Sequence, residues 1–322
     1  MWARVLPGRL MELPAESLPL WRRIRRRAYW IVVLVLLRLA DLVPITWGRA
    51  LGVGFARLAL VLRPTERRRA RVNLSDAFPH LDSESVERLV SDSAAALGRN
   101  FFDTLAAGRL LADVGCIVEE PNEDTGNLPL VEVIEELMTA GRGVLILGGH
   151  LGCWELLGGW LAVQLDGAGC GPLGAVTGTV HNPPVNRILQ DRRRALGLKV
   201  LPRDQGLGPL LRHLRGGRAV AVLLDQNTRV PNVQAPFFGR MAPTPTGFGN
   251  LALRNGVPVL PVSIARVDER HVVRHLAPML PAAVDPVSEM RLLDFLTDCN
   301  GSLERMIRRN PAEWVWFHRR WN

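Results

Sequence analysis

The chain has 322 residues, of which 48% are hydrophobic, and it carries a formal net charge of +9 at pH 7. This length allows one large hydrophobic core or two smaller ones. The four cysteines form no C-x-x-C pair and no zinc-finger spacing with histidines, which excludes a zinc finger and predicts free thiols. The positive charge indicates an anionic partner, but all except one of the 40 basic residues are arginines. A GC-rich genome produces such a bias, so the charge alone carries little weight.

A basic segment precedes an apolar run near the N-terminus. Residues 21–27 read WRRIRRR and residues 28–37 read AYWIVVLVLL. No A-x-A-like cleavage site follows, which argues against a secretory signal. Arg38 interrupts the run well short of the roughly 20 apolar residues that a spanning helix needs. We predict a basic segment and a membrane-associated helix over residues 1–45, either a short tilted span or an amphipathic helix in the membrane interface. A buried core helix is the alternative, and a second basic cluster at 63–71 supports membrane contact.

The rest of the chain, residues 46–322, is predicted to be one domain with a helical first part. Helical periodicity extends from residue 46 to about 140, including segments 83–111 and 127–143. From about residue 143, short apolar runs rich in β-formers alternate with helical segments. The runs are 143–149, 219–227 and 257–267, and the helices are 184–196, 208–214 and 290–309. This alternation predicts an α/β fold with a mixed, mostly parallel sheet flanked by helices.

The stretch GVLILGGHLGCWELLGGWLA, residues 143–162, contains a histidine and a glutamate five positions apart. His150 follows a predicted strand and two glycines, so we expect it in the loop at the carboxyl end of that strand, where ligands of open α/β sheets bind. Glu155 falls in the first turn of the next helix, and the two side chains can face each other. A neutral imidazole can take a proton from an attacking hydroxyl while a carboxylate fixes its tautomer. The pattern predicts a catalytic pair, and a histidine that merely caps the turn is the alternative.

Other catalytic motifs are missing from the sequence. No G-x-S-x-G nucleophile elbow occurs, so direct transfer to a substrate hydroxyl fits better than an enzyme-bound intermediate. The stretch also lacks the lysine of a P-loop and the second histidine of a zincin helix, and no metal site is expected. Asp225 ends the run 219–227 and is expected at the same edge of the sheet as His150.

Four segments, in order, resemble the bacterial lipid A biosynthesis acyltransferases, the lauroyl and myristoyl transferases. HLGCWE resembles their HLGNWE version of the glycerolipid acyltransferase motif H-x-x-x-x-(D/E). RRRARVNLSDAFPHL resembles an RRNL…FP segment, and VLLDQN…APFFGRMAPTPTG resembles DQD…PFFG…T.TG. RRNPAEWVWFHRRW resembles the ending P-E-x-W-x-W-x-H-R-R. In this ending we expect Trp314, Trp316 and His318 to be structural residues docked by a terminal strand.

The resemblance implies an O-acyltransferase on the cytoplasmic face of the inner membrane. It would move a fatty acyl chain from a thioester of acyl carrier protein or coenzyme A to a hydroxyl of a lipid A precursor, an anionic glycolipid, without a cofactor. His150 becomes the general base and Glu155 its partner.

The DQD and P-H-N segments add candidate substrate-binding residues by the same resemblance. Asp225 matches the first aspartate of the DQD segment, and Asn227 replaces the second. Thr179 stands where the family usually has an arginine before the P-H-N stretch. Arg187, or one of the arginines 192–194 such as Arg194, is expected to supply the missing charge.

Three alternatives remain open at this stage. Actinobacterial phosphatidylinositol mannoside acyltransferases share the fold and the histidine motif, typically use acyl-CoA, and acylate a different glycolipid. A non-catalytic lipid-binding homologue is more remote. A nucleic-acid binder is motivated by charge alone and lacks any recognisable binding motif, so we expect no nucleic-acid partner.

Overall fold

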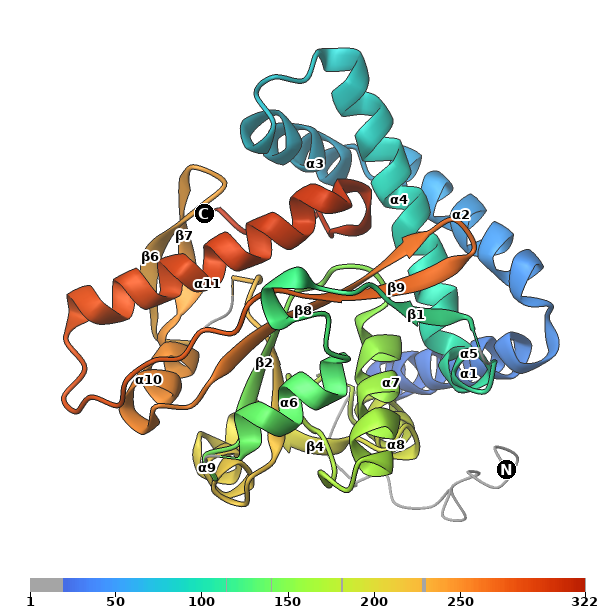
Figure 1. Cartoon of the computed structure of the whole chain (residues 1–322). Helices are drawn as coiled ribbons and strands as arrows, with labels where there is room; N and C mark the ends of the chain where they lie inside the picture. Colours follow the sequence, from blue (N-terminus) through green and yellow to red (C-terminus); the bar gives the residue numbers. More distant parts are fainter. Residues whose placement is uncertain (1–19, 114, 140, 181, 228–229, 322) are drawn as a thin grey trace.

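The computed structural model describes residues 20–321, except residues 114, 140, 181, 228 and 229 (Figure 1). The part of the predicted basic segment that falls on residues 1–19 lies outside the described residues, as do the side chains of Leu20, Arg22, Arg23 and Arg26.

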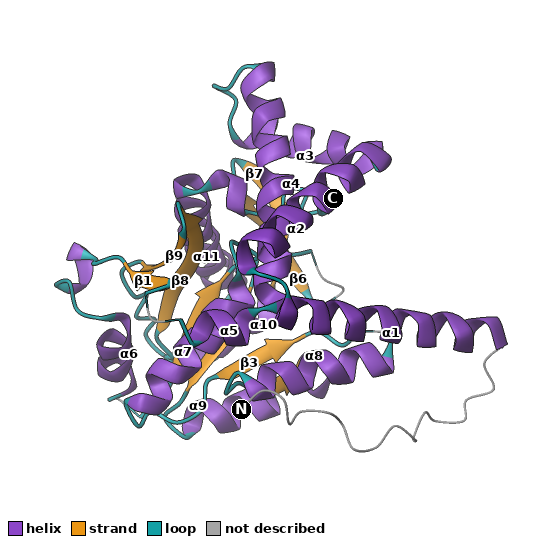
Figure 2. Ribbon diagram, turned by 90° about the vertical axis from the view of Figure 1, so that its right-hand side faces the viewer, coloured by secondary structure: helices purple, strands orange, loops and turns teal. Residues whose placement is uncertain are grey.

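The first part of the chain is helical, as its periodicity predicts. The helices are α1 (Leu20–Leu42), α2 (Ile45–Leu62), α3 (Pro64–Ala77), α4 (Ser83–Leu105) and α5 (Ala107–Leu111). Pro44 separates α1 from α2, and Asp82 caps α4 by accepting a hydrogen bond of 2.8 Å from the Ser85 amide. Helices α2, α3 and α4 form a group beyond one end of the sheet, while α1 runs alongside α8 (Figures 1 and 2).

Helix α2, rather than α1, has the length and apolar composition of a membrane span among the described helices. The apolar run 28–37 lies within α1, whose basic first turns lower its mean hydropathy. Of the residues of α2, only Gly48 and Arg49 are fully buried, although one face of the helix packs against α4. The membrane-associated helix predicted within residues 1–45 stays a prediction, and α2, which begins at Ile45, is a second candidate.

A seven-stranded sheet forms the centre of the α/β part. In spatial order its strands are β1 (Ile117–Glu119), β9 (Arg270–His275), β8 (Val259–Val267), β2 (Val144–Gly148), β5 (Ala219–Leu223), β3 (Gly174–Thr177) and β4 (Lys199–Pro202). All neighbouring pairs are parallel except β8 and β9, which form an antiparallel pair. The sheet is thus mixed and mostly parallel, as predicted. A separate antiparallel hairpin consists of β6 (Asn232–Phe237) and β7 (Arg240–Pro245).

Helices cover both faces of the sheet, because successive side chains of a strand point to opposite sides. In β2, Leu145 and Leu147 join a core formed with α9 (Gly208–Arg215), α10 (Thr246–Asn255) and α11 (Glu289–Arg309). Val144 and Ile146 join a second core formed with α6 (Leu130–Met138) and α7 (Trp154–Gly167). Helix α8 (Pro183–Ala195) lies at the margin and has no fully buried residue. These layers leave the carboxyl edge of β2, β5, β3 and β4 open for a site.

The C-terminal segment docks without forming a strand, contrary to the expectation from its aromatic residues. It contains a single 3₁₀ turn, η4 (Pro311–Glu313), and one isolated bridge between Leu151 and Trp314. Trp314 and Trp316 are fully buried, and their rings pack edge to face with centroids 4.6 Å apart. Proline at residue 311 and the bulk of these rings favour a compact turn over a regular ladder.

Candidate active site

The register of two neighbouring strands brings His150 and Asp225 together. Strands β2 and β5 are parallel, and Gly148 pairs with Leu223 at their carboxyl ends. His150 and Asp225 each lie two residues beyond this pair. Because the two strands run in the same direction, both residues emerge side by side at the same edge of the sheet. The histidine lies at the strand's carboxyl end, as predicted from the sequence.

The carboxylate of Asp225 accepts hydrogen bonds from both the ring and the backbone of His150. The Nδ1–Oδ1 distance is 2.8 Å, and the backbone N–Oδ2 distance is 2.7 Å. A carboxylate at Nδ1 fixes the tautomer in which Nδ1 carries the proton and Nε2 is the basic nitrogen. The His150 side chain is 20% exposed, so Nε2 belongs to a ring that substrate can reach.

Asp225 is fully buried and ionised. Burial alone would raise its pKa, but the interaction with His150 and the hydrogen bonds from His150 and Trp314 outweigh burial, so the pKa of Asp225 lies well below its ordinary value. The Trp314 indole Nε1 donates a hydrogen bond of 2.7 Å to Oδ2 of Asp225. Nε2 of His318 lies 3.1 Å from the backbone carbonyl oxygen of Asp225. The C-terminal segment therefore contributes a polar contact to the site as well as packing. Asp225 has no exposed surface and does not line the cavity described below, and its predicted role in substrate binding stays a prediction.

The loop after His150 depends on glycine at residue 152. Gly152 has a φ of +60°, and a Cβ there would lie 2.1 Å from the Ile264 carbonyl oxygen. Its amide donates to the Glu313 carbonyl over 3.0 Å. The turn thus packs closely against β8 on one side and hydrogen-bonds to the C-terminal segment on the other, which restricts the position of the imidazole.

Glu155 does not hydrogen-bond to His150 in the described structure; it pairs with Arg193. The Arg193 Nε lies 3.2 and 3.0 Å from the two carboxylate oxygens, and Nη2 donates to Oε1. Glu155 lies in the first turn of α7, where its side chain reaches α8 instead of turning back to the loop. Asp225 therefore occupies the position in which we expected Glu155. The Glu155–Arg193 pair remains beside the imidazole, because His150, Glu155 and Arg193 all line the same cavity.

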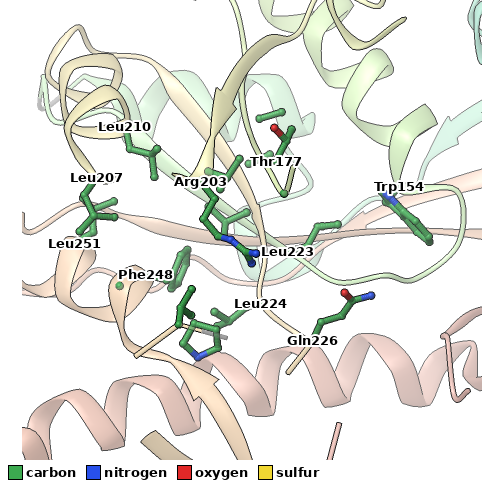
Figure 3. A pocket seen from close by; sticks show the side chains of 18 of the residues that line it. Trp154, Thr177, Arg203, Leu207, Leu210, Leu223, Leu224, Gln226, Phe248 and Leu251 are labelled. Carbon is green, nitrogen blue, oxygen red and sulfur yellow. The ribbon is translucent and has the colours of Figure 1, made fainter. Parts of the chain in front are cut away.

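This cavity has a volume of about 620 Å³ and opens at the carboxyl edge of the sheet (Figure 3). Its volume falls within the roughly 300–1,000 Å³ of small-molecule sites. Its walls are mainly small or apolar, and His150 and Trp154 lie at one end. The apolar lining includes Ala175, Val176, Leu198, Leu210, Ala221, Val222, Leu223, Leu224, Phe248 and Leu251. An elongated apolar group fits such walls while a polar group meets the imidazole.

The other predicted substrate-binding residues lie away from this cavity. Arg187 and Asn227 are exposed, and Arg194 pairs with Asp191 over 2.7 Å on the surface of α8. None of the three lines the cavity. Arg193, another of the three arginines at 192–194, does line the cavity, where the helical turn directs it toward Glu155.

Sequence reasoning missed Arg203 and Gln226, which also line the cavity. Both follow strand ends at the same edge as His150, which was the available signal. Among the residues that the structure describes, no group of three or more His, Cys, Asp or Glu side chains is arranged to hold a metal ion.

Comparison with known proteins places this arrangement in a family. The family model described as bacterial lipid A biosynthesis acyltransferase matches residues 19–322. The chain belongs to this family. The match spans both the helical first part and the α/β part, and it confirms the resemblance inferred from the four sequence segments.

Curated relatives fall into two groups. The chain is 26% identical over 273 residues to the lipid A biosynthesis palmitoleoyltransferase of Escherichia coli K12, covering 82% of each protein. It is 22% identical over 255 residues to the lipid A biosynthesis acyltransferase of Haemophilus influenzae, covering 78% of this chain and 74% of that protein. The phosphatidylinositol mannoside acyltransferase of Mycolicibacterium smegmatis is 29% identical over 129 residues, and this match spans only 39% of the chain and 41% of that relative.

Proposed function

We propose that this protein transfers a fatty acyl chain from a thioester of acyl carrier protein or coenzyme A to a hydroxyl group of an anionic glycolipid of the lipid A precursor class. The observation that carries the proposal is the His150–Asp225 pair at an apolar cavity of about 620 Å³. A base for the hydroxyl proton and an apolar site for the acyl chain are the two things that this reaction requires. Both occur here within one cavity, and the reaction needs no cofactor.

In the proposed reaction, Nε2 of His150 takes the proton from the acceptor hydroxyl as its oxygen attacks the thioester carbonyl. Asp225 holds the proton on Nδ1 and stabilises the imidazolium that forms. When the carbon–sulfur bond breaks, the leaving sulfur takes the proton back from Nε2. The products are an ester and a free thiol, and the histidine returns to its neutral form.

The class of acceptor rests on the relatives. Relatives named for lipid A biosynthesis match about four-fifths of the chain, which favours a lipid A precursor. A phosphatidylinositol mannoside is the second candidate, because the relatives named for it reach 29% identity over a shorter stretch. Both acceptor classes are anionic glycolipids with free hydroxyl groups.

We also propose that α2 lies in the membrane interface. Its residues Trp47, Leu51, Phe55, Leu58 and Leu62 recur at intervals of three or four and are all more than half exposed. The opposite face packs on α4, where a Cβ at Gly52 would lie 2.3 Å from the Gly98 carbonyl oxygen. A helix with one apolar outer face and one protein-packed face suits interfacial docking better than a span surrounded by lipid.

The polar side of α2 supports this orientation. Arg49 is buried, and its Nε donates to Asp103 Oδ1 over 2.7 Å. This buried ion pair fixes α2 to the protein, so the exposed stripe keeps one direction. An exposed arginine of α3 such as Arg68 suits anionic lipid headgroups beside the stripe. The inner membrane's cytoplasmic face is the proposed location, because both thioester donors are cytoplasmic molecules.

The test uses the purified full-length protein with a labelled acyl thioester and each acceptor class in detergent micelles. Wild type should form an acyl ester with one of the two acceptors, and His150→Ala should lower kcat by about 10²–10⁴-fold. The matched control is His80→Ala, which removes an exposed histidine outside the cavity and should leave kcat unchanged. A His150→Ala protein with wild-type kcat would contradict the proposal. Mass spectrometry of glycolipids from a deletion strain and its parent would identify the acceptor.

A further inference from the structure

Arg203 lies at the same edge of the sheet as the candidate catalytic pair. It begins the single 3₁₀ turn η3 (Arg203–Gln205), which directly follows β4. Strand β4 is parallel to β3, β3 to β5 and β5 to β2, so the carboxyl end of β4 lies on the side that carries His150. Arg203 lines the cavity, and Figure 3 shows its guanidinium pointing into the middle of it.

The charge of Arg203 is not balanced by any described residue. Of the Asp, Glu, Lys and Arg side chains in the described part of the chain, three line the cavity: Glu155, Arg193 and Arg203. Glu155 and Arg193 pair with each other. Arg203 forms no hydrogen bond or ion pair with a residue that the structure describes, and its neighbour Asp204 instead accepts a 2.8 Å hydrogen bond from Thr179. The cavity therefore carries one uncompensated positive charge beside largely apolar walls.

A guanidinium in this setting suits a phosphate group. Its planar N–H groups match two oxygens of a phosphate, and its charge stays in place at any physiological pH. On the proposed function, both substrates bring phosphate to this cavity. The pantetheine arm of the thioester donors ends in a phosphodiester in acyl carrier protein and in a diphosphate in coenzyme A, and the anionic glycolipid acceptors carry phosphate on their headgroup.

We infer that Arg203 binds a phosphate group of a substrate and so aligns that substrate for reaction at His150. The inference rests on the proposed function, since it assumes that the cavity holds an acyl donor and a glycolipid. Arg203 contacts the phosphate and takes no part in proton transfer. Its loss should therefore raise a KM or a Kd, while the loss of His150 lowers kcat.

The variants for the test are Arg203→Met and Arg203→Lys. The first keeps the apolar stem and removes the charge, and the second keeps the charge but removes the planar pair of N–H donors. The matched control is Arg215→Met, because Arg215 is also exposed, has no described partner and does not line the cavity. Arg203→Met should raise the KM of the phosphate-bearing substrate about 10- to 100-fold. Arg203→Lys should recover part of this loss, and all three variants should keep the wild-type thermal midpoint.

Two arms separate the sources of the phosphate. Palmitoyl-CoA is compared with palmitoyl-pantetheine, which lacks phosphate, and a phosphorylated lipid A precursor is compared with its dephosphorylated form. If the donor phosphate binds, Arg203→Met raises the KM of palmitoyl-CoA and not that of palmitoyl-pantetheine. If the acceptor phosphate binds, the same difference appears between the two acceptors. Unchanged KM values in both arms, or an effect equal to that of Arg215→Met, would overturn the inference.

Binding measurements keep this test separate from the proposed function. Calorimetric titration with hexadecyl-CoA, a thioether that cannot transfer its chain, and with the phosphorylated precursor needs no turnover. A wild-type protein that transfers no acyl chain would refute the proposed function. A Kd for both probes that does not change in Arg203→Met would refute phosphate binding by Arg203.

Discussion

Substituting Asp225→Asn tests the pairing of this carboxylate with His150 most directly. Oδ2 accepts from the His150 amide and the Trp314 indole, both over 2.7 Å, and Oδ1 accepts from Nδ1 over 2.8 Å. The carbonyl of asparagine will take the Oδ2 position, because it then satisfies two donors. The NH₂ group of the asparagine must then face Nδ1. The opposite orientation is unfavourable because it would place the NH₂ group against the N–H groups of His150 and Trp314.

The consequence is a change of tautomer. With an NH₂ group as neighbour, Nδ1 becomes the acceptor and the proton moves to Nε2, which can no longer act as a base. The comparable aspartate-to-asparagine change in serine protease triads lowers kcat by about 10⁴-fold. We expect a loss of about 10²–10⁴-fold here, or roughly 3–5 kcal/mol in the activation barrier. Two of the three hydrogen bonds survive, so the stability loss should stay within about 1–3 kcal/mol.

The assay is steady-state acyl transfer, with the thermal midpoint measured on the same preparations. Trp314→Phe is the control, because it removes one donor to Asp225 and leaves the carboxylate in place. It should destabilise the fold but lower kcat less than tenfold. A folded Asp225→Asn protein with kcat within about threefold of wild type would refute the assigned role of this carboxylate.

Three further predictions address other parts of the molecule. Glu155→Gln should reduce kcat/KM about tenfold by weakening the pair with Arg193. A loss as large as that of His150→Ala would contradict the assignment of Asp225, rather than Glu155, as the partner of the histidine. Phe55→Asp should lower co-sedimentation with anionic vesicles, whereas the same change at exposed Val163 should not; equal binding by both variants would refute the α2 stripe. Burial lowers the pKa of His213 below 6.5, so the unfolded state binds more protons and stability falls as the pH drops below about 6.5. Between pH 7.5 and 5.5 the thermal midpoint of His213→Gln should fall less than that of wild type, and an equal fall would exclude a contribution from this histidine.

The sequence by itself determined the main elements and the location of the site. Apolar periodicity predicted α2 to α5, α6, α8, α9 and α11, together with the buried strands β2, β5 and β8. It also predicted that His150 follows a strand at the carboxyl edge of the sheet. The strands β1, β3 and β4 were not predicted, because they have only three or four residues and are partly exposed. Such short segments show little apolar periodicity.

Only the tertiary structure decided which carboxylate meets the imidazole. Glu155 is near His150 in sequence, but the first turn of α7 directs it to Arg193 on α8. Asp225 is 75 positions away and reaches His150 because β5 pairs in register with β2. Trp314 reaches the same carboxylate from a further 89 positions along the chain. Strand order, register and the docking of a C-terminal turn depend on the packing of the whole core, and a local sequence pattern contains no information on contacts at such separations.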